Sequence, residues 1–88
     1  MWVTTRLGSV LPAAWSFMLA ARARGLGTCW TTLNSMFEDE SAEILDLPSD
    51  VNICAVIPVA YLIGDSFRPA IRLPVNEVAY LNGWGKPF

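Results

Sequence analysis

The feature that most constrains this chain is a predicted helix over residues 11–24 that is apolar on almost every side. Large apolar side chains lie on both of its sides, with Leu11, Trp15, Met18 and Leu19 on one and Phe17 on the other. Ser9 is the expected N-cap, Pro12 fits the first turn, and Gly25 fits the C-terminal end. A helix that is apolar all round is buried on more than one face, so we expect a long buried helix.

The overall composition points the same way. The chain has 88 residues, of which 53% are apolar. A domain of this size buries only about 60–65% of the surface that its unfolded chain exposes. We therefore expect a partner, a cofactor or further sequence to cover the excess.

A membrane is the alternative cover for so apolar an N-terminus. Arg6 precedes an apolar run over residues 10–21, in the manner of a signal peptide. The run is shorter than the roughly 20 residues that cross a bilayer. Pro12, Trp15 and the arginines at the supposed cleavage site also argue against cleavage. We expect a buried core helix and no membrane partner.

Charge and residue types exclude several function classes. The net charge is −2 and no basic stripe is present, so we expect no nucleic-acid partner. The chain has no histidine, which excludes Ser-His and Cys-His nucleophile pairs and the commonest zinc sites. We expect no catalytic side chain, no metal site, and a cofactor that carries the chemistry. Cys29 and Cys54 are expected to be free thiols in a reducing compartment, the cytoplasm.

The rest of the chain alternates short helices and extended segments. A strand is expected after Gly27 and a helix over residues 37–45, with a capping box made by Ser35 and Glu38. The inward-facing residues of this part should be Ile44, Leu45 and Leu47.

The second half is expected to be mostly extended. Residues 51–63 read as the main strand, covered on both faces, with Pro58 at a sheet edge or bulge. Prolines stiffen an arm over residues 68–74, and a final short strand is expected over residues 75–81.

Two groups of residues are candidates for binding a ligand. Trp30, Thr31 and Thr32 place an aromatic ring beside two hydroxyls after a glycine turn, which suits a flat ligand or an ordinary strand core. Arg68 and Arg72 suit a phosphate or a solvated surface. The preceding Gly25-Leu26-Gly27 is no dinucleotide fingerprint, because Trp30 occupies the third glycine position. That triplet fits a helix end followed by a turn.

Three blocks in this order resemble nitroreductase-like FMN-dependent oxidoreductases. Residues 19–30 (LAARARGLGTCW) are similar to that family's core helix and following turn. Residues 50–61, ending in Pro58-Val59-Ala60-Tyr61, resemble its strand, and residues 68–84 resemble its C-terminal arm. The family's basic, serine-containing cluster has no match here, and Ala70 stands where a lysine is common. We therefore expect residues 1–88 to form a single partial domain that corresponds to the family's C-terminal half.

The resemblance implies a fold and a site. It implies an α+β, partial nitroreductase-like fold in which a long buried helix packs on a small β-sheet with an extended C-terminal arm. It also implies an intertwined homodimer with FMN at the interface and the arm lying across the partner. The implied cofactor-binding residues are Trp30, Thr31, Thr32 and Leu33 at the flavin ring, Arg72 at the phosphate, and Arg68 in support.

The implied function is an FMN-dependent NAD(P)H oxidoreductase. Its small-molecule electron acceptors would be nitroaromatics, quinones or similar compounds. The alternative is a truncated, non-catalytic remnant of such an enzyme.

Overall fold

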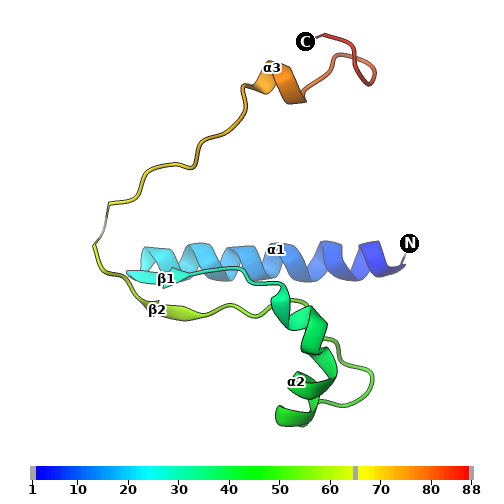
Figure 1. The fold of residues 1–88 in the computed structure, drawn as a ribbon, viewed down its shortest axis with the longest axis vertical. Coiled ribbons are helices and arrows are strands. Elements are labelled where there is room, and N and C mark those ends of the chain that lie inside the picture. Colours follow the sequence, from blue (N-terminus) through cyan, green and yellow to red (C-terminus); the bar gives the residue numbers. More distant parts are fainter. Residues whose placement is uncertain (1, 65, 88) are drawn as a thin grey trace.

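The computed structural model describes residues 2–64 and 66–87, and it is built around one long helix. This helix, α1 (Trp2–Ala23), has two short strands along its C-terminal part (Figure 1). The elements that follow are β1 (Leu26–Thr28), the 3-10 helix η1 (Leu33–Phe37), α2 (Glu38–Ile44), β2 (Val59–Tyr61) and α3 (Val75–Val78). The mixture of helices with a small antiparallel sheet agrees with the predicted α+β class.

α1 is longer than the sequence suggested. It spans 22 residues and runs through Ser9, with Pro12 in its interior. The predicted cap at Ser9 is wrong, because each residue that continues a formed helix adds a backbone hydrogen bond. The predicted C-terminal end is confirmed, since Gly25 adopts a φ of 79°, which glycine tolerates best.

β1 and β2 pair antiparallel and form a two-stranded sheet. Leu26 pairs with Tyr61 and Thr28 with Val59, and an isolated bridge between Thr31 and Val56 continues in the same register. Between these pairs the ladder is interrupted next to Pro58, which has no N–H to donate. The predicted extent of the main strand, residues 51–63, is therefore wrong. The structure has the three residues of β2 and one isolated bridge at Val56.

η1 and α2 form a separate projection below the strands (Figure 1). The predicted capping box is wrong. The Ser35 hydroxyl donates to the Thr32 carbonyl at 2.8 Å, while Glu38 accepts hydrogen bonds from Asn52 and Ile53. Ser35 and Glu38 do not bond each other, because the folded chain brings other hydrogen-bond partners closer to both.

The C-terminal end of α2 has the hydrogen bonds of a Schellman motif. Asp46 has a φ of 52°, its N–H donates to the Glu43 carbonyl at 3.2 Å, and the Leu47 N–H donates to the Ala42 carbonyl at 2.9 Å. This turn ends the helix before Pro48. Ile44 and Leu45 are 81% and 61% exposed, so the prediction that they point inward is wrong within one chain.

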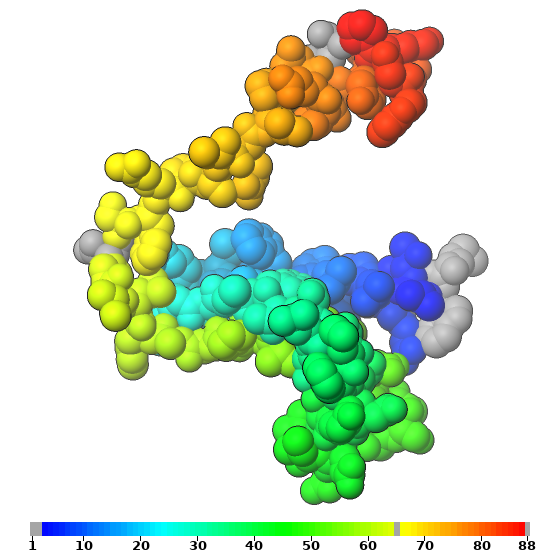
Figure 2. Space-filling view, in the orientation of Figure 1, coloured from blue at the N-terminus to red at the C-terminus, as the bar shows by residue number. Residues whose placement is uncertain are grey.

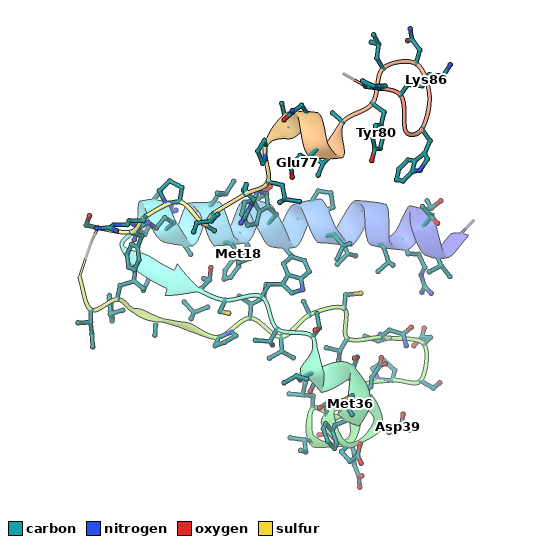
Figure 3. The ribbon with its side chains drawn as sticks, turned by 45° about the horizontal axis from the view of Figure 1, so that its top comes forward. Met18, Met36, Asp39, Glu77, Tyr80 and Lys86 are labelled. Atoms are coloured by element: carbon teal, nitrogen blue, oxygen red, sulfur yellow. The ribbon has the colours of Figure 1, made fainter. Side chains whose placement is uncertain are left out.

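The C-terminal arm leaves the rest of the molecule after β2. Figure 2 shows open space between this arm and α1, and α3 packs against no other described helix or strand. The predicted strand over residues 75–81 is instead a short helix, since no neighbouring strand is there to pair with it. Beyond it, Tyr80 lies in the C-terminal loop (Figure 3). Its ring contacts that of Trp84, with centroids 4.9 Å apart and the ring planes tilted by 60°.

The prediction of a buried helix is wrong for an isolated chain. Among the described residues with known burial, Ala21 is the one apolar residue classed as buried, and Trp15 is 55% exposed. The accessible surface is 7942 Å², whereas a compact protein of this mass exposes about 5,100 Å². The radius of gyration is 17.8 Å, against about 12 Å for a compact chain of this length. One chain alone does not supply the cover that α1 requires.

Gly27 is predicted to be the glycine that the sheet depends on most. A Cβ at this position would lie 2.8 Å from the Leu62 Cγ and would also collide with its Cδ2. We expect Gly27→Ala to destabilise the fold by about 1–3 kcal/mol, through overpacking, in urea unfolding followed by circular dichroism. Gly8→Ala is the matched control, because its Cβ meets nothing within 4 Å, and it should stabilise α1 by about 0.5–1 kcal/mol. Equal effects at both positions would contradict this packing.

The Thr31 hydroxyl is predicted to stabilise the end of the ladder. Both its Oγ1 and its backbone N–H donate to the Val56 carbonyl. Thr31→Val keeps the shape and the N–H bond but removes the hydroxyl, so it should lower the free energy of unfolding by about 0.5–1.5 kcal/mol. Thr32→Val, at an exposed neighbour, should change it by less than about 0.5 kcal/mol. A Thr31 variant as stable as the Thr32 control would show that this bond contributes nothing.

Candidate functional site

Residues 30–33, the ring segment, connect β1 to η1 and run beside residues 53–57. Trp30 and Thr31 are half-buried, whereas Thr32 and Leu33 are exposed, Leu33 by 75%. The two bonds from Thr31 to Val56 fix the segment at its middle. The sequence predicted a strand here. The structure has one bridged residue, Thr31, and Leu33 already begins η1.

An apolar hollow of about 360 Å³ lies on the Trp30 side of the ring segment. Its walls come from Trp30, from one face of α1 and from the stretch that precedes β2. The lining includes Val10, Leu11, Ala14, Ile53 and Ile57. Because α1 reaches this hollow from the side, the long helix and the ring segment form one surface.

A smaller and more polar hollow, of about 210 Å³, lies beside Thr31 and Thr32. Asn34 and Ser35 line it as well, opposite residues 53–56. The Ser41 hydroxyl donates to the Asn34 Oδ1 at 2.6 Å, but the Asn34 Nδ2 is buried without a hydrogen-bond partner among the described residues. A buried amide without a partner is unfavourable, and a bound carbonyl oxygen would satisfy it.

Arg68 and Arg72 lie away from the ring segment within one chain. Both are exposed on the C-terminal arm, and the Arg72 Nη1 donates at 3.3 Å to the carbonyl of Ile71, its own neighbour. Neither arginine lines the apolar hollow at Trp30 or the polar hollow at Thr31 and Thr32. A single chain therefore does not bring the six predicted site residues together.

The base of the arm is nevertheless attached to α1. The Arg22 guanidinium carbon lies 4.8 Å from the centre of the Phe67 ring, which fits a cation–π contact. Together with Trp15, Met18 and Leu62, these residues line a third hollow, of about 390 Å³. The arm thus departs from a fixed point at the C-terminal end of α1.

The chemistry of these groups fits FMN, provided that two chains contribute. The aromatic wall at Trp30 and the hydroxyls and amide beside it suit a flat ring with carbonyl groups along one edge. The Asn34 Nδ2 in the same region is buried and has no hydrogen-bond partner among the described residues. The exposed guanidinium of Arg72 suits the phosphate, although the two parts are separated within one chain.

Sequence reasoning missed two residues of this region. Asn34 carried no prediction, and Glu38 was read as half of a capping box. Their partners, Ser41 and the residues at 52–53, follow from the tertiary fold, so no local pattern reveals them.

The described portion of the chain contains no group of three or more residues arranged to hold a metal ion. None of its described helices combines the length and the apolar character needed to cross a bilayer.

Comparison with known proteins gives the family. The model of the Nitroreductase family matches residues 4–61, about two-thirds of the chain. The match contains α1 from Thr4 onward, the ring segment and β2, and it stops before Arg68 and Arg72. No solved structure matches this fold. Because the match covers well over half of the sequence, the chain belongs to the Nitroreductase family, whose general function is that of nitroreductase-like oxidoreductases.

Proposed function

We propose that this protein is an FMN-dependent NAD(P)H oxidoreductase of the nitroreductase type, acting on nitroaromatics, quinones or similar acceptors. The observation that carries the proposal is the ring segment. It lies inside the family match and is fixed between an apolar hollow and a polar one. The unpartnered Asn34 amide adds a donor on the polar side.

The proposal includes a homodimer. The accessible surface exceeds that of a compact protein of this mass by about 2,800 Å². Obligate dimers bury roughly 2,000–5,000 Å² in total, or about 1,000–2,500 Å² on each chain, so a second copy seated on α1 would cover a large part of this excess. The apolar side chains offered for that contact include Trp15, Phe17 and Leu19, each at least 50% exposed.

Each part of the chain has a role in the proposed reaction. When bound, FMN supplies the redox chemistry, taking a hydride from NAD(P)H and passing electrons to the acceptor. Trp30 and Leu33 exclude water from one side of the ring, and Thr31, Thr32 and Asn34 orient its polar edge. Arg72, supported by Arg68, neutralises the phosphate across the subunit boundary. No side chain is required as an acid or base, in agreement with the absence of histidine.

The cysteines support a location in the cytoplasm. Cys29 and Cys54 are both exposed and free. Exposed free thiols persist in a reducing compartment, so they support our proposal of a cytoplasmic enzyme.

Arg72 provides the sharpest test of the cofactor. We expect Arg72→Gln to weaken FMN binding by about tenfold to a hundredfold, because a charge-assisted bond to phosphate is lost. Binding of riboflavin, which has no phosphate, should be unchanged. Arg24→Gln is the matched control, since this arginine bonds the carbonyl of Ala20 in its own helix. Flavin fluorescence titration measures all of these affinities.

Two results would count against the proposal. A wild-type protein that binds neither FMN nor riboflavin would favour a non-catalytic member of the family. That second function has one observation in its favour, the separation of Arg72 from the ring segment within one chain. Equal losses of FMN and riboflavin affinity in Arg72→Gln would show that this arginine does not contact phosphate.

A further inference from the structure

Glu38 makes a connection that its position in the sequence does not suggest. It is the first residue of α2, and its Oε1 accepts a hydrogen bond from the Asn52 side-chain amide at 3.2 Å. The same oxygen accepts from the Ile53 backbone N–H, also at 3.2 Å. Glu38 is half-buried, and its bond to Ile53 is partly shielded from water, whereas its bond to Asn52 is exposed. One carboxylate thus joins the η1–α2 projection to the stretch that leads into β2.

This connection is one of two that bracket the same piece of chain. At the other end, Thr31 donates both of its hydrogen bonds to Val56. Between these points lie residues 53–56, which form the far wall of the polar hollow. Ile53 and Ala55 also line the apolar hollow beside Trp30. The wall opposite the ring segment is therefore held at Ile53 by Glu38 and at Val56 by Thr31.

We infer that Glu38 is a positioning residue for the flavin ring, an assignment that rests on the proposed function. Its carboxylate fixes the wall of residues 53–56 at the distance from the ring segment that both hollows require. The effect is indirect, because Glu38 lines neither hollow itself. A carboxylate suits this role, since its charge strengthens both bonds and one oxygen can accept two donors.

The chain offers a matched set of variants. Glu38→Ala removes the acceptor, whereas Glu38→Gln keeps a neutral oxygen at the same reach and should rescue part of the effect. Glu43→Ala is the control. It removes the same charge from the same helix, and among the described groups its carboxylate makes no hydrogen bond, while its backbone carbonyl accepts from Asp46.

Amide hydrogen exchange tests the connection without any cofactor. We expect Glu38→Ala to speed the exchange of the Ile53 N–H by about tenfold or more, with a smaller increase in Glu38→Gln and none in Glu43→Ala. Circular dichroism of each variant checks that the helices remain. If Glu38→Ala loses its helical signal, the exchange rate of the Ile53 N–H in Glu38→Gln is compared with that in Glu43→Ala. Faster exchange in Glu38→Gln than in Glu43→Ala then supports the connection, and equal exchange contradicts it.

Flavin titration tests the positioning role. Glu38→Ala should weaken FMN and riboflavin by the same factor, about tenfold, because the wall faces the ring and not the phosphate. Equal loss of both ligands separates this effect from that of a phosphate contact. If Ile53 exchange is unchanged in Glu38→Ala, or if it rises while both affinities stay at the wild-type value, the assignment is overturned. A wild-type protein that binds neither flavin overturns the proposed function and this inference together, whereas normal wild-type binding with an unaffected Glu38→Ala overturns the inference alone.

Discussion

The antiparallel ladder between β1 and β2, extended by the bridge from Thr31 to Val56, is the interaction on which the rest of the structure depends. α1 enters it through the turn at Gly25, the η1–α2 projection leaves from one end, and the C-terminal arm leaves from the other. The ladder is short because Pro58 interrupts it. Side-chain hydrogen bonds such as those of Glu38 therefore contribute more to holding the ring segment in place.

A shortage of buried surface explains the shape of the chain. α1 is apolar on several sides. Among the described apolar residues, however, Ala21 is the one that a single chain buries. An apolar helix in water is unfavourable, so the composition and the fold both require an external cover. In our proposal a second copy supplies that cover, and the same pairing brings an arginine arm to the ring segment. Stability and cofactor binding would then depend on one interface.

The sequence predicted the parts of the fold that local chemistry decides. The helix end at Gly25 and the break in the ladder near Pro58 follow from backbone constraints and were anticipated. Errors arose where distant contacts decide. Glu38 bonds residues 52–53 in place of Ser35, and the expected last strand became α3 because it has no neighbour to pair with. The ring segment was identified through a family resemblance, whereas Asn34 became visible only through its buried amide.

Subunit complementation tests the central claim most directly, that the site is shared between two chains. Trp30→Ala and Arg72→Gln subunits would each be defective in FMN binding as homodimers. Unfolded together and refolded as an equal mixture, they form heterodimers in which one site has both intact residues and the other has neither. The account predicts flavin bound tightly at about a quarter of all sites in the mixture, as random pairing into two-fold dimers requires. A mixture that binds no more FMN than its separate components would contradict it.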